Sequence, residues 1–102
     1  TLYATPITSN GIVTLTDDWD NYDEIVFYIS ETPNGSVGRQ FVSFYSDLLL
    51  ASDSTSTLIS RINTDGSGID LNFMDTNRNQ LYVIGSGDDD LIISIHGRFK
   101  RS

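Results

Sequence analysis

The apolar residues of this chain recur at close to every second position, in short runs that turn-forming clusters interrupt roughly every 8 to 12 residues. Successive side chains of a strand point to opposite faces, so this pattern is typical of half-buried strands. No window shows the period of an amphipathic helix. Parallel strands would need long crossover connections, which no segment supplies. The pattern therefore predicts an all-β fold, as an antiparallel β-sandwich or jelly-roll.

Turn-forming clusters divide the chain into about eight expected strands. By residue number these are 2–9, 12–16, 24–30, 39–49, 58–63, 69–75, 80–84 and 91–99. Asn10-Gly11 is a pair suited to a tight hairpin turn, so we expect it to join the first two strands. Further hairpins are expected at 65–68 and 76–79, and a polar loop at 53–56. No internal repeat is evident, which argues against a propeller or a β-helix.

Two expected strands carry large apolar side chains on both faces. The run 25–29 reads Ile-Val-Phe-Tyr-Ile, so this strand either lies in the centre of its sheet under a covering loop or buries its second face against another subunit. In the strand at 39–49, Phe41 and Tyr45 share one face while Val42 and Phe44 share the other. Neither face of that strand is purely solvent-facing.

Charge and length limit the classes of partner. Fourteen acidic and six basic residues give a net charge of -8, and such a surface repels nucleic-acid phosphates and anionic lipids. No stretch approaches the about 20 apolar residues that span a bilayer, so membrane insertion is not expected. The length of 102 residues predicts one domain spanning 1–102. The chain begins at Thr1 rather than Met, which we interpret as a piece of a longer protein.

Little in the sequence indicates catalysis or a cofactor. Cysteine is absent, which excludes disulfides, thiolate metal sites and cysteine nucleophiles. His96 is the single histidine, and no nucleophile motif surrounds it. The aspartates at 17–20 and 88–90 could offer oxygen ligands to calcium, but they lack EF-hand spacing and are more often turn formers. We expect neither a metal, nor a cofactor, nor an enzymatic activity.

Two short segments near the ends of the chain resemble a known family. Residues 15–27 follow the pattern L-(S/T)-x-x-x-x-N-Y-D-x-I-x-V, with Phe27 in place of the final Val. Residues 92–98 follow I-x-x-I-x-G-(I/R). These patterns open and close the C-terminal domain of bacteriophage and prophage tail proteins, which this chain resembles. The two matches bracket most of its length.

The resemblance implies the homotrimeric tip of a tail fibre or tail needle, built as the C-terminal part of a longer chain. Its jelly-roll sandwiches would resemble those of tumour necrosis factor and pack about a threefold axis. Such tips contact the host cell surface, so the implied partners are two further copies of the chain and a host glycan or outer-membrane protein. The implied location is the virion tail, extracellular on release.

Within this interpretation, two sets of residues are candidates. Loop residues would determine the receptor, and aromatic residues suit stacking on sugars or protein hot spots. The candidate receptor contacts are Trp19, Tyr22, Asn34 and Arg78. The candidate contacts between subunits are Val26, Tyr28, Phe44 and His96. For Trp19 the alternative is structural, namely packing over one end of the core.

Two further functions stay open. The domain could be a purely structural trimerisation or capping domain of a fibre, with no tight ligand, or a carbohydrate-binding module. A carbohydrate-cleaving domain is more distant, because glycosidases usually need a deep groove and this chain leaves little material to build one. Aromatic side chains exposed in loops would favour binding, and aromatics confined to a threefold axis would favour the structural role.

Overall fold

A computed structural model describes residues 1–36, 38–46, 57–63, 68–74, 77–87 and 90–100 of the chain. These residues form an all-β structure, as the sequence predicts. Its strands are β1 (Gly11–Thr14), β2 (Tyr22–Ser30), β3 (Gln40–Tyr45), β4 (Thr57–Asn63), β5 (Gly68–Met74), β6 (Gln80–Ile84) and β7 (Leu91–Lys100). A short 3-10 helix, η1 (Trp19–Asn21), precedes β2.

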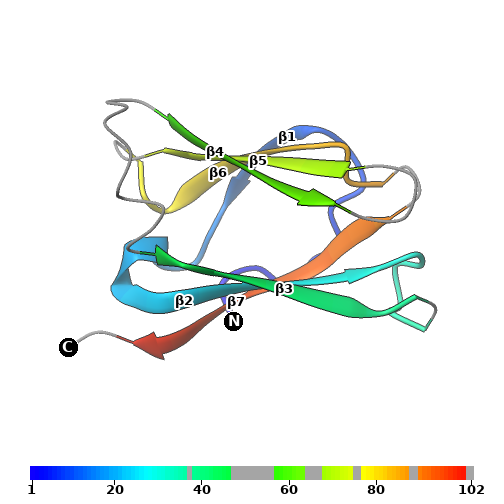
Figure 1. Ribbon diagram of the computed structural model, residues 1–102, viewed down its shortest axis with the longest axis horizontal. Coiled ribbons are helices and arrows are strands. Elements are labelled where there is room, and N and C mark those ends of the chain that lie inside the picture. Colours follow the sequence, from blue (N-terminus) through cyan, green and yellow to red (C-terminus); the bar gives the residue numbers. More distant parts are fainter. Residues whose placement is uncertain (37, 47–56, 64–67, 75–76, 88–89, 101–102) are drawn as a thin grey trace.

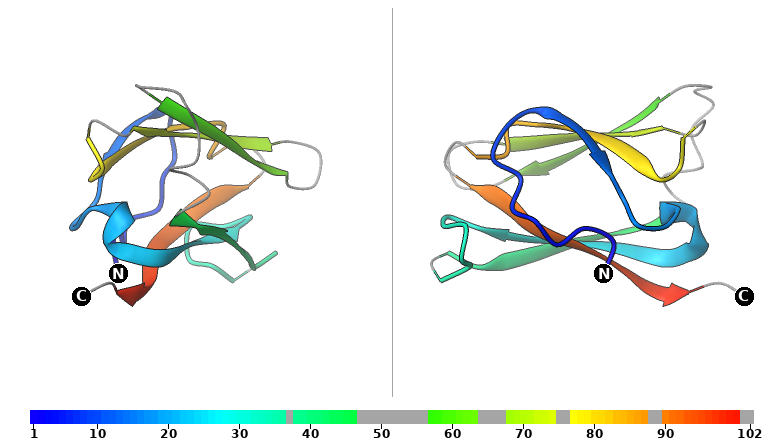
Figure 2. Two further views of the ribbon diagram at one scale, coloured as in Figure 1. Left: turned by 60° about the vertical axis from the view of Figure 1, so that its left-hand side comes forward. Right: turned by 180° about the vertical axis from the view of Figure 1, so that it is seen from behind.

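The strands form two antiparallel sheets that face each other (Figures 1 and 2). One sheet has the order β1-β6-β5-β4 and the other β3-β2-β7. Strand β2 is therefore the middle strand of its sheet, which is one of the two positions that its apolar faces predict. Tyr3 adds an isolated bridge to Ile95 on the free side of β7.

The connections confirm two expected hairpins and overturn one. Strand β5 pairs antiparallel with β4 on one side and with β6 on the other. The hairpin at Asn10-Gly11 is wrong, because β1 pairs with β6 while the segment before it lies along β7. Leu2 N and Ile7 N donate to the carbonyl oxygens of β7 residues Ile95 and Ile92, each at 2.8 Å. These distant partners satisfy the backbone groups that a local hairpin would have used.

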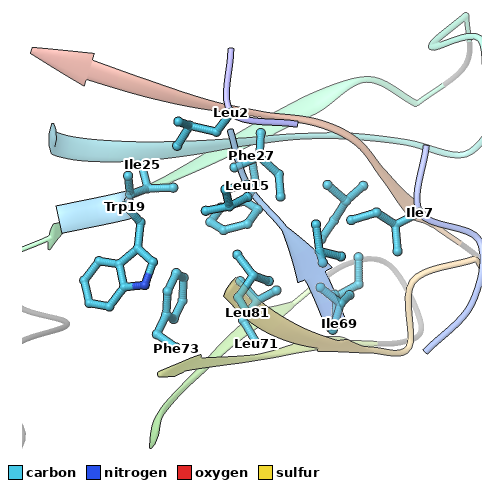
Figure 3. Packing of buried hydrophobic residues seen from close by; sticks show 14 of the residues in the cluster. Leu2, Ile7, Leu15, Trp19, Ile25, Phe27, Ile69, Leu71, Phe73 and Leu81 are labelled. Atoms are coloured by element: carbon cyan, nitrogen blue, oxygen red, sulfur yellow. The ribbon is translucent and has the colours of Figure 1, made fainter. Parts of the chain in front are cut away.

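The core lies between the two sheets and is built from alternate residues of their strands (Figure 3). Ile25, Phe27 and Ile29 of β2 are fully buried, as the period of two requires. Phe73 of β5 meets Phe27 edge-on at a centroid distance of 6.1 Å. Burying a large apolar side chain stabilises a fold by about 1.5–3 kcal/mol. Trp19 of η1 closes one end of this core, edge-on to Phe73 at 5.5 Å.

Strand bounds agree closely with the sequence pattern where it is regular. The last hairpin strand, expected at 80–84, is β6, and the strand expected at 24–30 begins two residues earlier, at Tyr22. The strand expected at 39–49 is β3 over Gln40–Tyr45. Residues 47–49 of that strand and the polar loop at 53–56 lie outside the described residues. So do residues 65–67 of the turn expected at 65–68, and two aspartates of the acidic run at 88–90.

Candidate functional site

The outer face of the sheet β3-β2-β7 carries a row of aromatic side chains. Tyr28 lies opposite Phe41 in the β2–β3 pair, and their rings meet edge-on with centroids 6.3 Å apart. On the other side, the Tyr28 ring lies 4.5 Å from the ring of His96 on β7. Tyr45 projects from the far end of β3, opposite Glu24. We call Tyr28, Phe41, Tyr45 and His96 the aromatic face.

The aromatic face is open to solvent in the single chain. Phe41 is 68% exposed, Tyr45 63% and Tyr28 42%. Charged side chains lie at its margin, where Glu24 and Arg98 approach to 3.2 Å as a charge pair without hydrogen-bond geometry. Exposed apolar side chains that gather on one face of a sheet mark a candidate interaction site.

The structure sorts the four candidate contacts between subunits. Tyr28 and His96 lie on the aromatic face. Val26 also points outward, between Ser43 and His96, but only 2% of it is exposed, so it offers little area to a partner. Phe44 points inward and packs edge-on against Phe27 at 5.8 Å, so it is a partly buried residue of the core side and does not lie on the aromatic face. The pleat of β3 instead presents Phe41 and Tyr45.

His96 is the histidine of this face, next to Tyr28. Its Nε2 lies 2.9 Å from Ser94 Oγ, and its ring packs against Tyr28. Partial burial lowers the pKa of His96 below its ordinary value of 6.5. The side chain is therefore neutral near pH 7, which suits a site that a second apolar surface covers.

At the η1 end of the molecule, the polar side chains form a closed network around Asp17. Asn21 Nδ2 donates to Asp17 Oδ1 at 2.8 Å, and Tyr22 Oη donates to Oδ2 at 3.1 Å. Lys100 Nζ lies 3.4 Å from the same oxygen. The hydrogen bond from Asn21 is the main cause that lowers the pKa of Asp17. Burial, followed by the bond to Asp17, raises the pKa of Tyr22. We call this network, with the nearby Arg78–Asp20 ion pair, the paired end.

Three of the four candidate receptor contacts lie at the paired end, and each is engaged within the chain. Trp19 is fully buried, so it cannot contact a receptor, and its role is the structural one of closing the core. Tyr22 is half-buried over Gly97 and hydrogen-bonded to Asp17. Arg78 forms an ion pair with Asp20 at 2.6 Å.

The fourth candidate, Asn34, lies at the opposite end, in the turn after β2 (Figure 1). It is exposed, and its Oδ1 accepts hydrogen bonds from Thr32 Oγ1 at 2.8 Å and from Ser36 N at 3.1 Å. The amide therefore shapes the turn. The structure does not bring the four candidates together into one site.

The same end of the molecule contains a hollow that the sequence did not indicate. An apolar cavity of about 300 Å³ is lined by Tyr28, Ile29, Arg39, Gln40, Phe41 and Ile93. A polar cavity of about 230 Å³ shares two of these residues and is lined by Glu31, Gly38, Arg39, Gln40 and Asp90. We call the two together the Arg39 hollow. In the sequence, the hollow corresponds only to the polar pair Arg39-Gln40 directly before Phe41, which is too common a pattern to predict a site.

The described residues also bear on metal ligands and on membrane-spanning helices. Its histidine and acidic side chains form no group of three or more with the convergence that a metal ion needs. Asp88 and Asp89 of the expected acidic run are not described. None of the described residues forms a helix of the length and hydropathy that crossing a bilayer requires.

Comparison with protein-family models, with curated proteins and with solved structures finds no match.

Proposed function

We propose that the chain is a non-enzymatic binding module, the homotrimeric tip domain of a bacteriophage tail fibre or tail needle. The two facing sheets would be a jelly-roll sandwich similar to that of tumour necrosis factor, at the C-terminal end of a longer virion protein. The tip would bind a glycan or an outer-membrane protein of the host during adsorption. The observation that carries the proposal is the aromatic face.

The aromatic face has the composition of a subunit contact. Interface cores are enriched in aromatic residues and depleted of charge, and here Glu24 and Arg98 at one margin of the face lie close enough to neutralise each other. A small domain also gains stability by burying further surface against copies of itself. In a threefold arrangement the same face of each subunit would turn towards the axis.

The two motifs that carry the resemblance contact each other in the structure. Tyr22 of the opening motif places its ring over Gly97 of the closing motif, where an added Cβ would clash with the ring. Ile25 and Gly97 are direct partners in the β2–β7 pair. The spacing of each motif therefore serves a contact between the first long strand and the last.

Molar mass in solution tests the subunit contact. We expect light scattering on a size-exclusion column to give about three times the 11.3 kDa of one chain at micromolar concentration. Tyr45→Glu would place three carboxylates near the axis and lower the mass to that of a single chain. The matched control is Ile12→Glu, because Ile12 is 58% exposed on the other sheet. A monomeric wild type, or equal effects of both variants, would contradict the proposal.

One observation favours the carbohydrate-binding alternative. Exposed aromatic rings beside a hollow would suit a sugar ligand whether or not the chain is trimeric. A purely structural capping domain would instead show the trimer mass and no ligand at the Arg39 hollow.

A further inference from the structure

We infer that the Arg39 hollow is the ligand site of this module and that it takes an uncharged sugar ring. This inference deepens the proposed function, because it names the ligand class and the place where the tip would hold it. It stands on three observations: an apolar wall, an unpaired polar rim, and the local balance of charge.

The apolar wall is formed by aromatic side chains that the fold holds in place. Tyr28 and Phe41 are cross-strand neighbours, and their rings support each other edge-on at 6.3 Å. Ile93 of β7 completes the lining from the other side of β2. Small-molecule sites are usually concave, mainly apolar and largely preformed, at about 300–1,000 Å³, and this cavity lies at the lower limit. It therefore suits a small ring rather than an extended chain.

The polar rim offers hydrogen-bonding groups that nothing in the described chain uses. The side chains of Arg39, Gln40 and Glu31 make no hydrogen bond or ion pair with any residue that the structure describes, although all three line the same hollow. Gly38 has a left-handed φ of 64°, and a Cβ there would come within 2.6 Å of the Glu31 carboxylate. The turn thus holds Glu31 close against the backbone beside Arg39. Together the rim provides donors and acceptors within reach of one ligand.

A sugar ring is the ligand that matches both features. A pyranose has an apolar C–H face, which packs on an aromatic ring, and hydroxyl groups around its edge, which donate and accept hydrogen bonds. Arg39 is opposed by the carboxylates of Glu31 and Asp90 in the hollow, so an anionic sugar or a phosphate would gain no net attraction. A purely apolar ligand would leave the rim unpaired, at a cost in desolvation. A neutral sugar therefore matches both the apolar wall and the polar rim, whereas an anionic or a purely apolar ligand matches only one of them.

The hollow and the proposed subunit contact share Tyr28 and Phe41, but they extend towards opposite ends of the same sheet. Gln40 lies opposite Ile29 at one end of the β2–β3 pair, and Tyr45 lies opposite Glu24 at the other end. A second subunit that packs over Tyr45 therefore leaves the Arg39 end at the margin of the contact, where a host glycan would have access.

Binding of simple glycosides to the whole chain tests the inference. The probes are the methyl glycosides of glucose, galactose, mannose, N-acetylglucosamine and N-acetylgalactosamine at millimolar concentration. Saturation-transfer NMR would detect weak binding, and amide shift changes would locate it. We expect at least one glycoside to bind and to shift the amides of Arg39, Gln40 and Phe41. A shift pattern centred elsewhere, or no binding by any of the five, would overturn the inference.

Two matched variants sharpen the result. Arg39→Ala should weaken the binding at least tenfold, whereas Arg78→Ala, which removes the same side chain at the paired end, should leave it within twofold. Circular dichroism of both variants checks that the fold is retained. Equal weakening by both would also overturn the inference.

The molar mass of the same samples separates this inference from the proposed function. A trimer that binds no sugar leaves the trimer proposal standing and removes the sugar site. A monomer that binds a sugar at Arg39 leaves the sugar site standing and removes the trimer proposal.

Discussion

The two ends of this molecule contain the same kinds of side chain and use them differently. Each end has an arginine, nearby carboxylates, an amide and an aromatic ring. At the paired end, Asp20 engages Arg78, and Asp17 accepts hydrogen bonds from Asn21 and Tyr22. At the Arg39 hollow, the corresponding polar side chains line a cavity and form no hydrogen bond or ion pair with a described residue. Residue type alone therefore does not separate a structural network from a binding site. The two are distinguished by whether the polar side chains already have hydrogen-bond or ion-pair partners within the chain.

The largest expected effect comes from the paired end. Trp19→Ala removes a fully buried side chain that packs on Phe73, so we expect the free energy of unfolding to fall by about 3–5 kcal/mol. Arg39→Ala, at the Arg39 hollow, should change the free energy of unfolding by less than about 0.5 kcal/mol. Urea denaturation followed by circular dichroism measures both. Similar losses for the two variants would break the comparison between the ends.

The contact between Tyr22 and Gly97 gives the next effect. Gly97→Ala places a methyl group against the Tyr22 ring, and overpacking of this kind costs about 1–3 kcal/mol of unfolding free energy. Tyr22→Ala removes the obstacle, so the double variant should be more stable than the sum of the two single losses predicts. A purely additive double-mutant cycle would show that the ring is not what limits this position.

A smaller effect isolates one hydrogen bond of the network. Tyr22→Phe removes only the hydroxyl that donates to Asp17, and we expect a loss of about 1 kcal/mol in unfolding free energy. Tyr28→Phe is the matched control, because the Tyr28 hydroxyl has no hydrogen-bond partner among the described residues. That control should differ from wild type by less than about 0.5 kcal/mol. Equal losses would mean that the Asp17 network contributes nothing specific.

The pH dependence of stability should show the smallest effect. The pKa of His96 is lowered from 6.5 in the folded chain, so the unfolded chain binds more protons in the window just below pH 6.5. Stability from this group is fully present above pH 6.5 and is lost as the pH falls through that window towards the folded pKa. His96→Gln should flatten the curve there. An unchanged slope in the variant would assign the dependence to other groups.

The carboxylate of Asp17 acts in a separate, more acidic window. Its pKa is lowered from 3.8, so its contribution is present above that value and is lost below it.

Sequence reasoning predicted the strands better than it predicted the site, and β3 shows why. The period of two correctly separated Phe41 and Tyr45 from Val42 and Phe44. Both sets are apolar, so the pattern could not say which set faces the core, and Phe44 was placed on the wrong side. The inner face is decided by the packing of the opposite sheet, through contacts such as that between Phe44 and Phe73.

The errors at the turns have a similar origin. Asn10-Gly11 is a good local hairpin signal, yet Asn10 Oδ1 accepts a hydrogen bond from the distant Gly85 N at 2.9 Å. The local preference of Asn10-Gly11 for a hairpin turn is overridden because β1 pairs with β6. The Arg39 hollow also depends on distant partners, since its lining joins residues from β2, β3 and β7. The sequence pattern does not show which distant residues line a common cavity.

The position of β7 also determines how this domain can fold. The last strand lies between β2 and the N-terminal segment, so this sheet acquires its final order only after nearly the whole domain has left the ribosome. Folds dominated by such distant pairings typically fold in milliseconds to seconds, because the loop must close before its contacts form. Until then one edge of β2 has no partner strand. Newly made chains are therefore most prone to aggregate during synthesis, before β7 emerges to cover one edge of β2.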